Sequence, residues 1–183
     1  PGNARFVVPG VDAVLFLSLV SGRNPQFLIG EHVLAAPTLK RLGVEPIPTA
    51  YMLVDSGRMT SVEFMSGTRP LPRDKPDIAM AHAMAAQYLG KRIVFFDAGS
   101  GAKEHVPGEL VEAVAGYVDI PVMVGGGVRT PEAASSLVGT IRASARSEPA
   151  SRSVSDDVAF PLRTVMSYRS LILLPRSTLA SMT

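Results

Sequence analysis

Short apolar runs alternate with longer helical patterns through most of the chain. Each run is apolar on both faces, which is typical of parallel strands covered by helices. The runs predict strands at residues 13–19, 45–54, 92–96 and 120–124. The segments that follow them predict helices at residues 26–42, 77–89, 106–117 and 131–138. This alternation predicts an α/β fold whose parallel sheet is either doubly wound or closed into a barrel.

Turn and capping residues mark the ends of several of these elements. Asp55-Ser-Gly is a turn signal, and the β-like residues 57–65 after it predict a hairpin extension of the second strand. Thr130 is the expected N-cap of the last helix, because Pro131 follows it at the first helical position.

The composition changes near residue 140. No glycine follows Gly139, and residues 141–157 are rich in Arg and Ser without a helical or strand period. We therefore expect a globular domain at residues 1–140 and a tail at residues 141–183 that is disordered or the product of a frameshift. The apolar residues 171–174 predict one short turn or strand within it. A basic tail is also typical of binding to nucleic acid or anionic lipid.

Composition and charge exclude several classes of protein. The chain has no cysteine, which rules out disulfides, thiolate metal sites and cysteine nucleophiles. It has 18 Lys and Arg against 16 Asp and Glu, and this net charge of +2 argues against nucleic acid as the main partner. No apolar stretch approaches the length of a membrane span, and no signal-peptide pattern opens the sequence. These features predict a soluble, cytoplasmic protein.

Two glycine-rich segments follow successive predicted strands. Asp97-Ala-Gly-Ser-Gly follows the third strand, and Gly125-Gly-Gly follows the fourth. Free backbone N–H groups beside a helix N-terminus bind anions, and parallel strands bring such loops to one edge of the sheet. The pair therefore predicts a phosphate site, with plain tight turns as the alternative. Neither segment matches a nucleotide-binding motif.

A few side chains near these loops are candidates for chemistry. Asp97 lies at the expected carboxyl edge of the sheet, where it is a candidate general base, metal ligand or turn-forming residue. Tyr51 lies near the end of the second strand and points either to the carboxyl edge of the sheet or into the core. Arg129 faces either the phosphate or solvent. The histidines lack metal-ligand spacing, and we expect packing or surface roles for His32, His82 and His105.

Five separated runs resemble the geranylgeranylglyceryl phosphate synthase family, whose bacterial relatives make heptaprenylglyceryl phosphate. The runs are FLSLVSGRNPQFLIGEHVLAAP, EPIPTAYMLVDSG, MSGTRPLPRDKPDIAMAHAMAAQYLG, FFDAGSGA and VMVGGGVRTPEAA. The resemblance implies a TIM-barrel-like (β/α)₈ fold, of which residues 1–140 would hold about the later five strands. It implies a prenyltransferase of ether-lipid biosynthesis, which joins sn-glycerol 1-phosphate to a polyprenyl diphosphate with Mg²⁺ and releases diphosphate.

The resemblance also implies roles for individual residues. The family's Tyr-x-Glu-x-Gly-Ser-Gly segment falls on residues 95–101, and its Glu, the base for the glycerol hydroxyl, falls on Asp97. Tyr51 matches a tyrosine that lines the substrate site. The implied glycerol phosphate site comprises Phe95, Asp97, Ala98, Gly99, Ser100, Gly101, Gly126 and Gly127.

The sequence departs from the family pattern at several points. Phe95 replaces a tyrosine, and Asp97 is one methylene shorter than Glu, which withdraws its carboxylate by roughly 1.5 Å. A displacement of that size costs on the order of 10²-fold in rate. The family's Mg²⁺-binding Asp has no counterpart, so the implied metal ligand lies outside this chain, and the last phosphate loop is missing. We therefore expect the chain alone to be unstable or inactive.

Other interpretations stay open beside the prenyltransferase. One is a non-catalytic paralogue that binds phosphate, and another is a different phosphate-binding TIM-barrel enzyme that acts on a sugar or indole phosphate. The resemblance further implies a homo-oligomer and peripheral membrane contact through the lipid product.

Overall fold

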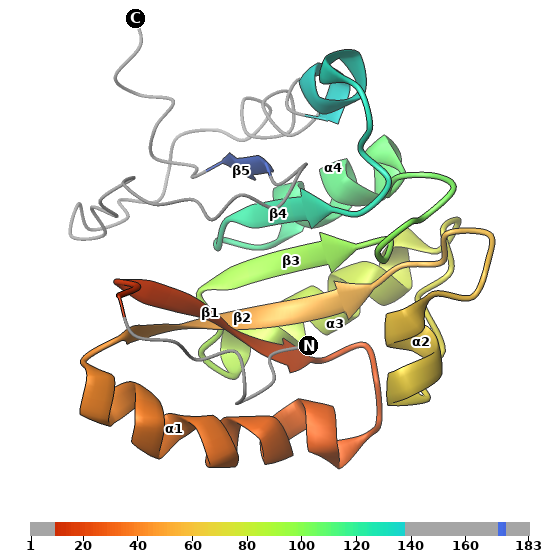
Figure 1. Ribbon diagram of the computed structural model, residues 1–183. Coiled ribbons are helices and arrows are strands. Elements are labelled where there is room, and N and C mark those ends of the chain that lie inside the picture. The colour runs from red at the N-terminus through yellow and green to blue at the C-terminus, as the bar shows by residue number, and fades with distance from the viewer. Residues whose placement is uncertain (1–9, 138–171, 175–183) are drawn as a thin grey trace, which may run out of the picture.

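A five-stranded sheet organises the computed structural model, which describes residues 10–137 and 172–174. Its strands follow one another in chain order across the sheet (Figure 1). The first four are parallel, and the fifth is antiparallel to the fourth. They are β1 (Ala13–Leu19), β2 (Glu45–Leu53), β3 (Ile93–Asp97), β4 (Val122–Gly125) and β5 (Ile172–Leu174).

Helices connect the parallel strands and cover one face of the sheet. In Figure 1, α3 and α4 lie behind β2, β3 and β4, and α1 runs below β1. A π-helical turn, η2, leads directly into α1, and residues 131–137 form a further helix after β4. The labelled helical elements are η2 (Gln26–Gly30), α1 (Glu31–Leu42), α2 (Ser61–Ser66), α3 (Pro76–Tyr88) and α4 (Gly108–Tyr117).

Strand alternation divides the buried side chains between two apolar layers. The layer behind the sheet joins β2, β3 and β4 to α3 and α4, and the alanines of α3 allow a close approach. The layer on the front face contains Leu19, Tyr51, Leu53, Ile93, Phe95 and Met123. The side chains of Tyr51 and Phe95 therefore lie on the front face of the sheet, opposite the face that the helices cover.

Strand register brings the carboxyl ends of four strands to one edge. Leu19 pairs with Tyr51, Leu53 with Asp97, and Asp97 with Gly125. The loops after β1, β2, β3 and β4 consequently leave the sheet side by side. This edge is where parallel α/β proteins place their ligands.

Most of the expected elements are confirmed within a few residues, but the hairpin extension at residues 57–65 is wrong. The chain there forms α2, which a capping box begins: Thr60 Oγ1 accepts from the Glu63 N–H at 3.3 Å, and Glu63 Oε2 accepts from the Thr60 N–H at 3.4 Å. The spacing Thr-x-x-Glu signals this start. It outweighs the β propensity of Val62 and Phe64.

The C-terminal part of the chain contributes one described element. β5 lies within the apolar segment 171–174, where the sequence predicts a short turn or strand. The rest of the expected tail lies outside the described residues. Among the helices of the described residues, none combines the length and the apolar character needed to cross a membrane.

Candidate functional site

A tyrosine and a carboxylate meet at the carboxyl edge of the sheet. The Tyr51 hydroxyl on β2 donates a 2.5 Å hydrogen bond to Asp97 Oδ2 at the end of β3. Tyr51 is 2% exposed, and its ring lies edge-on to that of Phe95 with centroids 5.4 Å apart. The contact joins residues 46 positions apart in the chain. Tyr51 and Asp97, the two candidates for catalysis, thus form one hydrogen-bonded pair.

The surroundings keep the Tyr51 hydroxyl protonated. Burial raises the pKa of Tyr51 far above its usual range, and the neighbouring Asp97 carboxylate and the hydrogen bond to it raise the pKa further. A phenol with so high a pKa acts as a hydrogen-bond donor throughout the physiological range. Tyr51 therefore orients Asp97 and is not suited to act as the base itself.

The first glycine loop folds back onto Asp97. The Gly99 N–H donates to Asp97 Oδ1 at 2.7 Å, so each carboxylate oxygen has one partner. Gly99 has a φ of +90°, and a Cβ there would lie 2.5 Å from Thr60 Cγ2. The start of α2 therefore presses on this loop and leaves no space for a side chain. The Arg58 guanidinium adds a hydrogen bond to the Gly101 carbonyl oxygen.

The second glycine loop packs against the first. Gly126 has a φ of +75°, and a Cβ on it would lie 2.5 Å from Asp97 Oδ1 and 2.8 Å from the Gly99 nitrogen. The two loops therefore touch through their backbones beside the Asp97 carboxylate. Such an approach is possible only with glycine.

The remaining expected site residues have different surroundings. Ala98 is fully buried, and its N–H donates to the Gly125 carbonyl at 3.1 Å. Ser100 is exposed on the loop. Phe95 is 9% exposed within the front apolar layer, below Tyr51. The structure thus brings Tyr51 and Asp97 together with the glycines and places Phe95 as packing under them.

Arg129 and the histidines have structural partners. Arg129 donates to the Ala102 carbonyl at 2.8 Å, so it ties the loop after β4 to the loop after β3. His82 Nδ1 donates to the Ile78 carbonyl one turn earlier, and His105 Nδ1 to the Val106 carbonyl. His32 is buried against Phe16. These contacts agree with the expected packing and surface roles of the histidines.

Three residues of this edge were missed by sequence reasoning: Arg58, Thr60 and Arg73. Thr60 had a usable signal in its capping box with Glu63. The two arginines had none, because their partners are backbone carbonyls of a distant loop.

A metal ion finds no cluster of ligands in the described part of the chain. Within residues 10–137 and 172–174, no three His, Cys, Asp or Glu side chains form a group that could hold one. Asp97 has a phenol and a backbone N–H as partners, and no second carboxylate joins it. These residues do not fit the implied Mg²⁺ site.

A parallel α/β sheet with adjoining glycine loops at the carboxyl ends of its strands is typical of both doubly wound and TIM-barrel-like proteins. The chain itself belongs to the PcrB family, whose model matches residues 1–145. This confirms the family resemblance and the fold that it implies.

Relatives and solved structures agree with that assignment. The chain is 51% identical over 134 residues to a geranylgeranylglyceryl phosphate synthase of Spirosoma linguale, covering 73% of this chain and 54% of the relative. It is 45% identical over 138 residues to the Pyrococcus horikoshii enzyme of that name, covering 75% and 54%. The chain thus spans about half the length of these curated relatives.

A crystal structure of (S)-3-O-geranylgeranylglyceryl phosphate synthase from Thermoplasma acidophilum, in complex with its substrate sn-glycerol-1-phosphate, matches with a TM-score of 0.71 at 41% identity. The match covers 76% of this chain and 56% of that chain.

Proposed function

We propose that this chain carries the glycerol phosphate half of a prenyltransferase site. The observation that carries the proposal is the Tyr51–Asp97 pair, 2.5 Å apart, beside two glycine loops that touch at Gly126. The Thermoplasma acidophilum relative, whose structure contains sn-glycerol-1-phosphate, supports the choice of ligand.

The two loops suit a phosphate group. Glycines carry no side chain that would block an anion, and backbone N–H groups in such loops bind phosphate dianions. Gly99, Gly101, Gly126 and Gly127 all have φ between +71° and +90°. Ser100 is exposed on the same loop and adds a hydroxyl donor. We assign Ser100, Gly101, Gly126 and Gly127 to the phosphate end of the ligand. The N–H groups of Ala98 and Gly99 are bound to the Gly125 carbonyl and to Asp97, so these two residues shape the site.

In this proposal Asp97 takes the proton from the glycerol hydroxyl. In the proposed step, the free primary hydroxyl oxygen of sn-glycerol 1-phosphate bonds to C1 of the prenyl diphosphate. The allylic C–O bond to diphosphate breaks, diphosphate leaves with the bonding pair, and the hydroxyl proton passes to Asp97. Tyr51 holds the carboxylate in place through its fixed donor, which favours a defined geometry for proton transfer.

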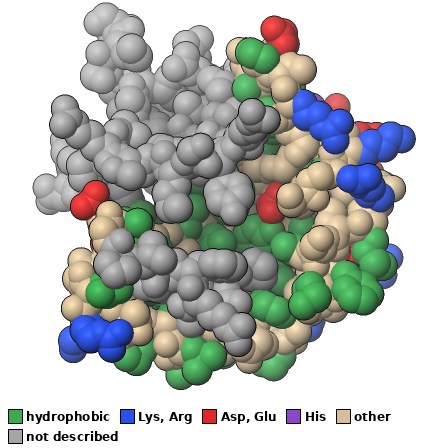
Figure 2. Space-filling model, in the orientation of Figure 1, with side chains coloured by type: hydrophobic (Ala, Val, Ile, Leu, Met, Phe, Trp, Pro, Cys, Tyr) green, Lys and Arg blue, Asp and Glu red, His purple; other side chains and the backbone are tan. Residues whose placement is uncertain are grey.

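The prenyl chain needs an apolar surface rather than polar groups. In the view of Figure 2 hydrophobic side chains are visible in the middle of the front of the molecule. The front apolar layer, with Leu19, Tyr51 and Leu53 at its core, belongs to this face of the sheet. We propose that the prenyl chain lies over the margin of this layer, because Leu19, Tyr51 and Leu53 are themselves at most 2% exposed.

Mg²⁺ belongs to the diphosphate half of the reaction. The described residues do not provide its ligands, so the step above uses only this chain's own groups. Glycerol phosphate binding is accordingly expected to be independent of Mg²⁺. Homo-oligomerisation and peripheral membrane contact rest on the family resemblance, and cytoplasmic location rests on the composition of the sequence. All three belong to the same proposal.

A second candidate function is phosphate binding without turnover. The replacement of Tyr by Phe95 and of Glu by Asp97 favours it. Binding of sn-glycerol 1-phosphate with no prenyl transfer to it, in the presence of geranylgeranyl diphosphate and Mg²⁺, would select this alternative.

Isothermal titration with sn-glycerol 1-phosphate tests the proposal. We expect saturable binding of one ligand per chain, unchanged by EDTA, and weaker binding of sn-glycerol 3-phosphate. Asp97→Asn should keep the binding within a few-fold and lose any transfer, whereas the matched control Asp12→Asn at the amino end of β1 should change neither. Absence of binding by the unmodified chain would refute the proposal.

A further inference from the structure

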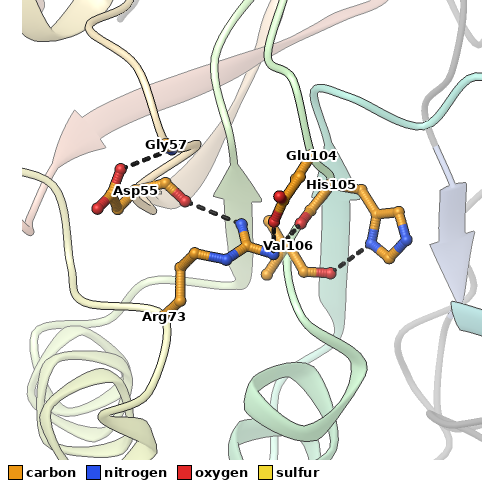
Figure 3. Close-up of polar contacts among 6 residues, drawn as sticks. All are labelled: Asp55, Gly57, Arg73, Glu104, His105 and Val106. Atoms are coloured by element: carbon orange, nitrogen blue, oxygen red, sulfur yellow. Dashed lines mark hydrogen bonds and ion pairs between the residues drawn. The ribbon is translucent and has the colours of Figure 1, made fainter.

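Arg73 bridges two loops of the candidate site. Its Nη1 donates to the Asp55 carbonyl at 3.0 Å, and its Nη2 donates to the His105 carbonyl at 3.0 Å. Nη2 also lies 3.1 Å from Glu104 Oε2. Figure 3 shows the guanidinium between Asp55 on one side and Glu104 and His105 on the other. One planar group therefore fixes the loop after β2 relative to the loop after β3.

The base of the Arg73 side chain is itself held. The Leu71 N–H donates to the Leu53 carbonyl at 2.8 Å, and the Asp55 N–H donates to the Leu71 carbonyl at 3.0 Å. Pro72, next to Arg73, restricts its own φ. Arg73 thus projects from a segment that is hydrogen-bonded along the end of β2. Its guanidinium, called the Arg73 fork below, therefore holds a fixed distance between the two loops.

The segment that Arg73 holds supports the second glycine loop. A Cβ on Gly127 would lie 2.7 Å from the Glu104 carbonyl oxygen and 2.8 Å from the His105 nitrogen. Gly126, the next residue back, packs in the same way against Asp97 and Gly99. Contacts therefore run from the Arg73 fork through Glu104 and His105 to both glycine loops.

We infer that Arg73 is a positioning residue that sets the spacing of the two glycine loops and so the affinity for glycerol phosphate. The ligand named here rests on the proposed function, whereas the ordering of the loops does not. The effect comes from the fork and not from the ion pair, because Glu104 is 58% exposed and such pairs contribute little. A lysine cannot reproduce a planar fork that reaches two carbonyls.

The test compares four variants of the full chain by titration with sn-glycerol 1-phosphate and by amide hydrogen exchange. Arg73→Lys and Arg73→Gln should each weaken binding about tenfold, the effect of one lost hydrogen bond to a charged group. Both should also speed exchange at Gly99 and Gly127. Glu104→Gln, which keeps the fork, should stay within twofold. The control Arg92→Gln, which breaks the 2.9 Å ion pair to Glu45 at the other end of the strands, should change neither readout.

The outcomes separate this inference from the proposed function. Wild-type affinity and exchange in Arg73→Lys would overturn the inference, as would a Glu104→Gln effect equal to that of Arg73→Lys. A lower urea midpoint without a change in affinity would reduce Arg73 to a structural role, which also overturns it. If the unmodified chain binds no glycerol phosphate, the proposed function fails. In that case the amide exchange rates at Gly99 and Gly127 in Arg73→Lys decide whether the inference holds. If Arg73→Gln does not fold, Arg73→Lys alone serves as the test variant.

Discussion

Gly126 is the point of closest approach between the two glycine loops, and a single methyl group there should separate them. Gly126→Ala would place its Cβ 2.5 Å from Asp97 Oδ1 at a φ of +75°. Gly43 is the matched control, since its φ is +67° and nothing lies within 4 Å of a Cβ there.

We expect Gly43→Ala to lower the free energy of unfolding by about 1 kcal/mol, the cost of a left-handed residue. Gly126→Ala should cost more and weaken binding of sn-glycerol 1-phosphate by at least about tenfold. Urea denaturation and titration calorimetry give the two quantities. Equal behaviour of the two alanines would show that the loops have room to separate.

Tyr51 should matter through its hydroxyl and not through its ring. Tyr51→Phe keeps the edge-on contact with Phe95 and removes the 2.5 Å hydrogen bond to Asp97. A hydrogen bond to a charged group predicts a loss of roughly 1.5–3 kcal/mol in the free energy of unfolding. Tyr117→Phe, at a 49% exposed tyrosine, is the control and should lose much less in the same urea titration.

The sequence predicts single residues of the site better than their contacts. Asp97 and the glycines stand out because glycine-rich loops after strands have a known use. That Tyr51 meets Asp97 depends on the register of β2 against β3, which local patterns do not determine. Arg73 has no local signal, because its partners are backbone carbonyls that any residue type supplies.

At the scale of elements, α2 links helix capping to the site. Its N-cap residue Thr60 accepts a hydrogen bond from the Glu63 N–H. The Thr60 side chain also fills the space that a Cβ on Gly99 would need. Thr130 has the first role without the second, since its Oγ1 accepts from the Ala133 N–H at 3.2 Å at the start of the helix at residues 131–137. A comparison of Thr60 with Thr130 therefore separates the effect of helix capping from the effect of the contact with the Gly99 loop.

Thr60→Ala and Thr130→Ala should each lower the free energy of unfolding by about 1 kcal/mol, the usual value of a lost N-cap. Only Thr60→Ala should increase amide exchange at Gly99, because its methyl and hydroxyl no longer press on the loop. Exchange mass spectrometry resolves this difference. Faster exchange at Gly99 in both variants would contradict the local role of α2.

Element types could be predicted almost throughout, because parallel strands and their helices have distinct apolar periods. The α2 segment is harder to predict, since six residues are too few for a helical period and its Val and Phe favour β structure. Only the capping box of Thr60 and Glu63 marks its start. Pro37 lies inside α1 and still does not end it, and tertiary packing of Ala35 and Leu39 against the first strand outweighs its cost there.

At the scale of the whole molecule, stability should depend on pH through a buried group on the rear side of the sheet. His32 on α1 hydrogen-bonds Ser18 on β1, and Lys91 donates to the same Ser18 hydroxyl at 2.6 Å. Burial lowers the pKa of His32 below 6.5, and the charge of Lys91 lowers it further. The unfolded chain therefore binds more protons than the folded chain below about pH 6.5.

Stability should accordingly fall as the pH drops through 6.5 toward the lowered pKa of His32. Lys91→Met should raise the pKa of His32 and shrink this pH dependence without abolishing it, because burial is the larger cause. Urea midpoints at pH 7.5 and 5.5 and the NMR titration of His32 give both readouts. An unchanged His32 pKa in Lys91→Met would contradict the coupling.

The order of the strands also has a consequence for how the chain acquires its structure. Every parallel pair joins strands that are successive in the chain, so each strand can dock on the one before it as synthesis proceeds. Tyr51 and Asp97 come together when β3 docks, but the loop at Gly126 arrives only with β4. A nascent chain therefore cannot bring its two glycine loops together until its fourth strand is in place.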